Sequence, residues 1–175
     1  MNIMRGIASR YAVGTTRKYR RIINFNADIK SSQTALFMMP RLSMEFYLAR
    51  SVVESLMKYF GRIVLVVADN MRELATYRSE VITFSEKDQN FLRLPSANLI
   101  SRLRGEEIDL AFDLSFSEDI FMSYLCRKSD TKVAVGFSKP NSDQFYDLQI
   151  RQPSGGDMKN AYENLKNTIK MFKEK

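Results

Sequence analysis

Short apolar runs alternate along this chain with longer segments in which apolar residues recur every three or four positions. Continuous apolar runs are typical of buried strands, and the wider spacing is typical of helices that bury one face. The runs predict strands at 34–39, 62–67, 80–84, 108–114, 131–137 and 145–150. The spacing predicts helices at 44–60, 71–77, 97–104, 118–128 and 158–173.

This alternation also predicts the fold class. Strands separated by helices favour a parallel sheet with helices on both faces, because each crossover helix packs on one side of the sheet. We therefore expect a single Rossmann-like three-layer α/β domain at 31–175, which follows a basic N-terminal arm at 1–30. The sheet would be mostly parallel, with about six strands.

Sheets of this kind bind ligands beyond the carboxyl ends of their strands. This rule selects residues at the predicted strand ends as candidates for a ligand cleft. They are Pro40, Arg41, Ser43, Asp69, Asn70, Asp113, Ser115, Ser117 and Ser138. Asp113 also fits a structural interpretation, in which its carboxylate accepts backbone N–H groups of residues 115–117 in a turn.

Composition excludes several kinds of catalytic site. The chain has no histidine, which excludes a Ser-His-Asp triad, an imidazole general base and a His-ligated metal. Its one cysteine, Cys126, excludes an internal disulfide, and we interpret it as a small packed apolar residue. Glu118 and Asp119 fit the start of a helix, and with Glu86 and Asp88 they form no recognisable cation cage. We expect no metal site.

The glycines argue against a nucleotide cofactor. A dinucleotide site needs glycines in the first strand–helix turn, and the corresponding turn here, 39–44, has none. The chain has 7 glycines, and none belongs to a cluster that would surround a phosphate. We expect no cofactor.

The positive charge is concentrated at the N-terminus. The chain has 27 basic and 20 acidic residues, a net charge of +7, yet residues 1–30 carry seven basic side chains and one acid. A basic arm favours anionic partners such as nucleic acid or a membrane surface. The anion-binding candidates are Arg17, Lys18, Arg20 and Arg21. Residues 3–11 fit either an interfacial helix or a helix packed on the body or on a twin subunit.

Two of the predicted strands carry a recognisable pattern. Residues 108–114 read Ile-Asp-Leu-Ala-Phe-Asp-Leu, and residues 131–137 read Thr-Lys-Val-Ala-Val-Gly-Phe. With the helix between them, they resemble heptosyltransferase-like glycosyltransferases of the GT-B fold. The resemblance covers roughly residues 34–150, which correspond to the N-terminal, acceptor-side domain of that family. In the family, the first strand commonly ends in Gly-Asp; here the equivalent positions are Met44 and Glu45, followed by Ala49, Ser51, Val52 and Leu56.

The resemblance implies a catalytic candidate and a missing part. The family's proposed catalytic Asp falls at Glu45, which would deprotonate an acceptor hydroxyl as a general base. The alternative is structural, because an acid in the first turn of a helix is favoured by the helix dipole. Family members hold the sugar nucleotide in a second domain, and we expect this chain to end before such a domain begins.

Three functions remain open from the sequence. We expect first a non-catalytic, stand-alone glycosyltransferase-like domain that acts through binding or self-association, as a homodimer or with a protein partner that replaces the second domain. The alternatives are the acceptor-side half of a two-chain glycosyltransferase in envelope or lipopolysaccharide biosynthesis, and a nucleic-acid or membrane-surface binder that uses the arm. Since no stretch has the ~20 apolar residues of a membrane span, and charges interrupt every secretory core, we expect a cytoplasmic protein, with the inner face of the membrane as its alternative location.

Overall fold

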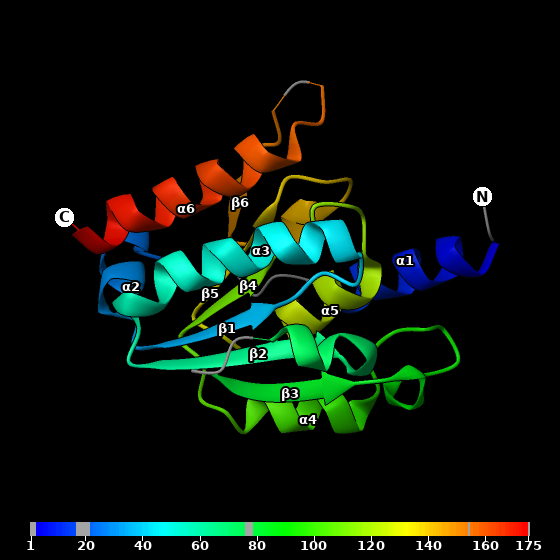
Figure 1. The fold of residues 1–175 in the computed structure, drawn as a ribbon. Coiled ribbons are helices and arrows are strands. Elements are labelled where there is room, and N and C mark those ends of the chain that lie inside the picture. The colour runs from blue at the N-terminus through cyan, green and yellow to red at the C-terminus, as the bar shows by residue number, and fades with distance from the viewer. Residues whose placement is uncertain (1–2, 17–21, 76–78, 154, 175) are drawn as a thin grey trace.

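The protein folds around one sheet of six parallel strands in the order β3-β2-β1-β4-β5-β6. A computed structural model describes residues 3–16, 22–75, 79–153 and 155–174 (Figure 1). The strands are β1 Thr34–Met38, β2 Arg62–Ala68, β3 Glu80–Phe84, β4 Leu110–Asp113, β5 Val133–Phe137 and β6 Leu148–Ile150. The chain runs outward from β1 to β3, returns to the centre, and then runs outward from β4 to β6. This is the Rossmann-like order, so the predicted fold class is confirmed.

Helices cover both faces of the sheet (Figure 1). One face carries α2 Phe25–Ser31, α3 Ser43–Leu56 and α6 Met158–Glu174, and the other carries α1 Ile3–Thr15, α4 Ala97–Arg104 and α5 Ile120–Lys128. The crossover helix α3 follows β1 on the first face, whereas α5 follows β4 on the second. The loops that leave these two central strands therefore diverge.

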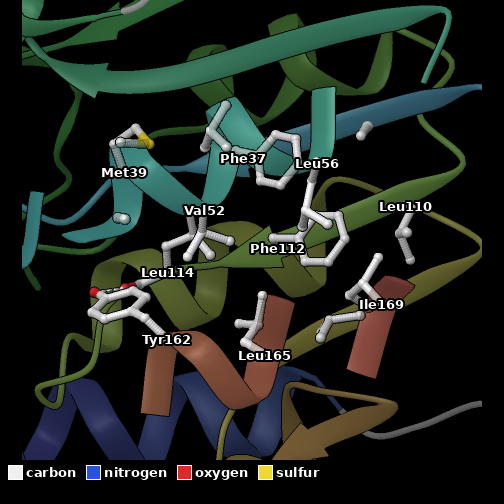
Figure 2. Packing of buried hydrophobic residues seen from close by; sticks show 14 of the residues in the cluster. Phe37, Met39, Val52, Leu56, Leu110, Phe112, Leu114, Tyr162, Leu165 and Ile169 are labelled. Carbon is white, nitrogen blue, oxygen red and sulfur yellow. Dashed lines mark hydrogen bonds between the residues drawn. The ribbon is translucent and has the colours of Figure 1, made fainter. Parts of the chain in front are cut away.

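Alternate residues of each central strand face opposite helical layers. In β1, Ala35 and Phe37 belong to the core beneath α3 and α6, while Leu36 and Met38 belong to the core beneath α4 and α5. The rings of Phe37 and Phe112 stack with their centroids 4.6 Å apart (Figure 2). Burial of each large side chain contributes about 1.5–3 kcal/mol, so the strands form a rigid base for the loops at their carboxyl ends.

The N-terminal helix α1 packs on the body of the domain. Ala8 and Ala12 are buried in the same core as residues of α5. The ammonium of Lys128 donates to the carbonyl of Thr15 at 2.8 Å. These contacts favour the packed-helix interpretation of this segment. Within the residues that the structure describes, no helix is long and apolar enough to cross a membrane.

The sequence does not predict α2, which begins in the expected arm and ends one residue beyond it. Asn24 caps this helix by accepting the Ala27 N–H at 3.2 Å, and Asp28 accepts the Asn24 N–H at 2.9 Å. Ile29 is fully buried in the core that also contains residues of α6. Residues 25–31 therefore pack on the sheet domain.

The last strand is shorter than predicted, because a turn precedes it. The N–H of Tyr146 donates to the carbonyl of Ser142 at 2.9 Å, and Phe145 has helical backbone angles. The extended backbone therefore begins at Leu148 and not at residue 145.

Other boundaries shift by a few residues at element ends. The predicted helix at 71–77 is a 3-10 helix at Asp69–Leu74, and the one at 44–60 ends at Leu56 before a 3-10 turn at Met57–Tyr59. The predicted helix at 118–128 begins at Ile120, because Asp119 caps it. The strands predicted at 108–114 and 131–137 begin at Leu110 and Val133.

Candidate binding site at the switch point of the sheet

The strand order changes direction between β1 and β4. These strands pair side by side, with Met38 opposite Asp113. Since β1 continues into α3 on one face and β4 into α5 on the other, the two loops separate beyond the sheet edge. Ligands of doubly wound sheets bind at this place.

A cleft of about 390 Å³ opens between these loops, and we call it the switch-point cleft. Its volume lies in the range of small-molecule sites. Its lining comes from the loop after β1, the first turn of α3 and the loop after β4: Arg41, Leu42, Glu45, Ser115, Ser117, Glu118 and Asp119.

A larger cleft of about 990 Å³ adjoins the first, and we call it the outer cleft. The two clefts share Arg41, Glu118 and Asp119 in their linings. The rest of the outer cleft comes from α1, from the loop after β3 and from the start of α5: Ala8, Glu86, Gln89, Asn90, Phe91, Leu92, Arg93, Ile120 and Phe121. The same three side chains therefore form part of the wall of both clefts.

Glu45 joins the two loops of the switch-point cleft. It lies in the first turn of α3 and is 2% exposed. Its carboxylate accepts the backbone N–H of Phe116 at 2.9 Å, and the N–H of Ser117 at 3.2 Å. The Ser117 hydroxyl also donates to it. Three hydrogen bonds from one loop hold this carboxylate, so its first role is to fix that loop against α3.

Arg41 forms the boundary between the two clefts. Its guanidinium donates to both oxygens of Asp119, at 2.7 and 2.8 Å. Asp119 also accepts the N–H groups of Phe121 and Met122 as the N-cap of α5. This bidentate geometry fixes the loop after β1 to the start of α5.

Behind the cleft, Asp113 is the centre of a closed polar network. It is fully buried at the end of β4, and its carboxylate accepts the Ser115 N–H at 2.9 Å and the Ser123 hydroxyl at 3.1 Å. The Tyr146 hydroxyl also donates to it, and the Lys139 ammonium lies 3.5 Å away. The Ser115 contact matches the turn interpretation of Asp113 that the sequence left open.

Lys139 connects this network to the loop after β4. Its side chain is 5% exposed, and its ammonium donates to the Ser115 carbonyl at 2.8 Å. Burial, followed by the negative charge of Asp113, raises the pKa of Tyr146 well above its ordinary value, so the phenol remains a hydrogen-bond donor. The ring of Tyr146 occupies the space beside Gly136, where an added Cβ would lie 2.5 Å from it.

Ser115 is the exception in this well-paired region. The residue is 2% exposed and lines the switch-point cleft. Its N–H and carbonyl are both bonded, but its hydroxyl has no hydrogen-bond partner among the described residues. A buried polar group without a partner costs about 1–3 kcal/mol.

The outer cleft has an exposed aromatic ring at its edge. Phe91 is 83% exposed and lies in the loop after β3. This loop is held by Asn90, whose side-chain oxygen accepts the N–H groups of Leu92 and Leu94 at 2.9 and 3.1 Å. Leu92 and Leu94 are buried, so the loop is anchored while the Phe91 ring faces solvent.

The structure brings together only part of the predicted site. Glu45, Arg41, Ser115 and Ser117 line the switch-point cleft, and Asp113 lies directly behind it. Pro40 is buried; with the exposed Ser43, Asp69, Asn70 and Ser138, it is not part of the lining of either cleft. The arm candidates Arg17, Lys18, Arg20 and Arg21 lie outside the described residues.

The residues that sequence reasoning missed come mainly from two places. The first is the loop after β3, from Gln89 to Arg93. These residues follow neither a helical nor a strand pattern, and this was the available sequence signal for a loop. The second is the pair Lys139 and Tyr146, whose contacts with Asp113 join segments far apart along the chain. A strand-end lysine signals such a contact weakly.

The described residues contain no group of three His, Cys, Asp or Glu side chains that could hold a metal ion. Cys126 is fully buried. Burial, reinforced by the charges of Asp113 and Asp147, raises the pKa of this thiol well above its ordinary value. The thiol is therefore a packed group, as the sequence predicts.

Fold and cleft together define a Rossmann-like α/β domain with a cleft at its switch point. The chain belongs to a family of unknown function, DUF6913, whose model matches residues 42–172. The matched segment includes both loops of the switch-point cleft except Arg41. No curated protein matches the sequence.

A solved structure shares the fold. The crystal structure of the glycosyl transferase family 9 from Veillonella parvula DSM 2008 aligns with a TM-score of 0.56 and 18% sequence identity. The alignment covers 79% of this chain and 42% of that chain, so this chain spans less than half of that protein's length. The likeness confirms a glycosyltransferase-like fold, while the more specific resemblance to heptosyltransferases stays a prediction.

Proposed function

We propose that this chain acts as a non-catalytic binding domain on a glycosyltransferase-like fold, with the switch-point cleft as its ligand site. The cleft supports the binding part of the proposal, because it has the position and the volume of a ligand site. The hydrogen bonding of the Glu45 carboxylate supports the non-catalytic part of the proposal.

A general base needs a carboxylate oxygen that can reach the proton it removes. An ionised carboxylate offers about four lone-pair sites. In Glu45, hydrogen bonds from Phe116 and Ser117 occupy three of them. These three hydrogen bonds fix the loop after β4 against α3, and the side chain is only 2% exposed. Glu45 therefore fits a structural role better than the catalytic role that the resemblance implies.

The first test is a transfer assay. The purified chain is incubated with UDP-, ADP- and GDP-sugars and a set of sugar acceptors, and release of the nucleoside diphosphate is followed. We expect no release above the buffer rate, for the wild type and for Glu45→Gln alike. Release that depends on Glu45 would overturn the proposal, because it would mean that this chain catalyses sugar transfer by itself.

The second test asks whether the cleft is the binding site. Leu42 lines it and Tyr47 does not, although both lie near the start of α3 and both are 57% exposed. A panel of amines, diols, sugars and nucleoside diphosphates is screened by thermal shift. We expect stabilising compounds to lose their effect in Leu42→Trp, which fills the cleft, and to keep it in Tyr47→Trp. Shifts that survive in both variants would place the binding elsewhere.

A further inference from the structure

We propose that the surface where α1, α4 and α5 end binds a single-stranded nucleic acid, with Arg104 and Lys128 on its phosphates and the Tyr11 ring against a base. This surface is separate from the switch-point cleft. Arg104 and Lys128 precede β4 and β5 and lie at the amino edge of the sheet, whereas the cleft lies at the carboxyl edge. The inference therefore goes beyond the proposed function and does not depend on it.

The three helices lie on one face of the sheet and meet at their last residues (Figure 1). The Nε of Arg104, in the last turn of α4, donates to the carbonyl of Lys128 at 3.0 Å. The Lys128 ammonium, at the end of α5, donates to the carbonyl of Thr15 at 2.8 Å. Thr15 ends α1, and its hydroxyl donates to the carbonyl of Tyr11 at 2.9 Å. These contacts gather two cations at the end of α1 that carries Tyr11.

These two cations are not matched by carboxylates. Arg127 lies 3.5 Å from the Asp147 carboxylate, whereas Arg104 and Lys128 form no salt bridge among the described residues. Each helix dipole favours a cation in its own last turn, which accounts for either residue alone. Their position side by side adds repulsion, since burial and then the positive charges of Arg104 and Arg127 lower the pKa of Lys128. An anion bound here would relieve that repulsion.

The donors that remain suit phosphate oxygens. The Lys128 carbonyl holds the Nε of Arg104, and the two terminal NH2 groups of Arg104 make no hydrogen bond with the described residues. A guanidinium presents such donors as a planar fork that matches a phosphate group. The Lys128 ammonium has three donors, of which the Thr15 carbonyl accepts one. Arg104 is exposed and Lys128 is partly exposed, so a ligand can reach both side chains.

An exposed aromatic ring accompanies the cations. Tyr11 is 49% exposed and lies one turn before Thr15, on the same side of α1. Any base can stack on such a ring, because every base has a π-face. A base in a duplex is already stacked on its neighbours, so the ring favours a single strand. Arg10, also exposed, precedes Tyr11 and adds positive charge.

The same charges would attract an anionic membrane, but the apolar surface of α1 does not match one. A helix that lies in a membrane surface needs a broad apolar face directed toward the lipid. In α1, Ala8 and Ala12 are buried against the body of the domain. The described side chains on its exposed side include two large apolar ones, Ile7 and Tyr11, and Arg10 is exposed with them. One accessible ring beside cations suits a base better than a bilayer.

The test measures how the full chain binds a fluorescently labelled oligouridine RNA of about 12 nucleotides. Fluorescence anisotropy is recorded between about 50 and 200 mM KCl. We expect binding that weakens steeply with salt. On a single strand, each phosphate contact contributes about −0.7 to the slope of the logarithm of the binding constant against the logarithm of the salt concentration.

A matched pair of double variants locates the phosphate contacts. Arg104→Gln combined with Lys128→Gln should weaken binding about tenfold or more at low salt and make the slope smaller by about 1.4. Lys58→Gln combined with Lys159→Gln is the control, because it removes the same charge from exposed lysines on the opposite face of the sheet. The control should bind the RNA like the wild type.

Two variants of Tyr11 test the stacking. Tyr11→Ala should weaken RNA binding about fivefold or more without changing the salt slope. Tyr11→Phe keeps the ring and should bind like the wild type. The same RNA annealed to oligoadenine is the second control: Tyr11→Ala should not change its affinity, because the bases of a duplex are not free to stack on the ring.

The basic residues of the N-terminal arm need a separate variant. Arg17, Lys18, Arg20 and Arg21 lie outside the described residues and are not part of the proposed surface. Replacement of all four by glutamine should lower the affinity through their charge. In that background, the Arg104→Gln and Lys128→Gln substitutions should still weaken binding.

Several results would overturn the inference. They are the absence of RNA binding at low salt, equal affinities of the two double variants, an unchanged affinity in Tyr11→Ala, and binding to phosphatidylcholine–phosphatidylserine vesicles in place of RNA. RNA binding that needs only the arm would also overturn it. Leu42→Trp, which tests the switch-point cleft, should leave RNA binding unchanged, so this inference and the proposed function can fail separately.

Discussion

Two polar clusters lie side by side at the carboxyl edge of the sheet. They differ in how many of their polar groups have a hydrogen-bond partner. Between β4 and β5, Asp113 bonds to Ser115, Ser123 and Tyr146 and lies beside the Lys139 ammonium. The cavity next to this cluster measures about 10 Å³, too little for a ligand. We call Asp113, Ser123, Tyr146 and Lys139 the closed cluster, because their side chains contact one another and leave no space for a ligand.

Between β1 and β4 lies the second cluster, which we call the open cluster: Ser115 and Glu45 at the switch-point cleft. The cleft has a volume of about 390 Å³, an unpaired buried hydroxyl at Ser115 and a carboxylate, Glu45, with acceptor capacity left. Buried polar networks that are fully satisfied make a structure rigid, whereas an unsatisfied group invites a partner. The comparison favours a scaffold role for the Asp113 cluster and supports the binding role that we propose for the switch-point cleft.

The first prediction has the largest expected effect, because the substitution disrupts the closed cluster. Asp113→Ala leaves the buried Lys139 ammonium without its carboxylate, which should lower the free energy of unfolding by about 3–5 kcal/mol. Urea denaturation measures the loss. Asp143→Ala, an exposed acid nearby, is the control and should stay within about 0.5 kcal/mol of the wild type.

A double variant checks that the Asp113 effect comes from the pair. Lys139→Met combined with Asp113→Ala removes both charges, so the loss should be smaller than the sum of the two single losses. Additive losses would show that the two side chains act independently and would weaken the closed-cluster interpretation.

The second prediction concerns the space that the Tyr146 ring occupies. Gly136→Ala places a methyl group 2.5 Å from that ring, inside the sheet. The ring must move away from Asp113 and Ser123, and we expect a loss of about 1–3 kcal/mol in urea denaturation. Gly61→Ala, where the nearest atom to an added Cβ lies at 3.5 Å, should have a much smaller effect.

The third prediction tests Glu45 as a structural carboxylate. Glu45→Gln replaces one acceptor oxygen by an NH2 group, which faces N–H donors of Phe116 or Ser117. We expect a loss of about 1–3 kcal/mol in the free energy of unfolding. Glu54→Gln, on the exposed side of the same helix, should change stability little. If both variants are as stable as the wild type, Glu45 does not hold the loop after β4 in place.

The fourth prediction follows the pH dependence of two tyrosines. Burial raises the pKa of Tyr146 and of Tyr162, and the charges of Asp113 and Glu45, respectively, raise it further. Because the unfolded chain ionises near pH 10 and the folded chain only above it, their contribution to stability is complete below about pH 10 and is lost as pH rises further. Absorbance at 295 nm should show that these two phenols ionise only above pH 10.

The sequence predicted the sheet well, because its strands are continuous apolar runs whose burial on both faces leaves few alternatives. Helix α4 begins and ends at the predicted residues, since Ser96 caps it and Gly105 follows it. Helix α2 was missed because its seven residues carry one fully buried side chain, Ile29, too few to produce a helical pattern.

The sequence predicts only those residues of the candidate site that closely follow the end of a strand. Arg41, Glu45, Ser115 and Ser117 follow β1 and β4, which meet at the switch point, so the strand-end rule finds them. The same rule selected Asp69 and Ser138, whose strands end away from that point. The rule does not reveal which hydroxyl lacks a partner, because that depends on contacts such as those of Lys139 with the loop after β4.

The smallest expected change in stability comes from the open cluster and separates it most sharply from the closed one. Ser115→Ala removes a buried hydroxyl that has no partner among the described residues, together with its cost of desolvation. The main-chain bonds of Ser115 to Asp113 and Lys139 remain, so the unfolding free energy should stay equal or rise by up to about 1 kcal/mol. Ser123→Ala is the matched comparison, because its hydroxyl bonds to Asp113 and Tyr146, and its loss should destabilise the fold by about 1–3 kcal/mol. Similar losses in both variants, measured by urea denaturation, would mean that the Ser115 hydroxyl serves the scaffold, and the distinction between the two clusters would fail.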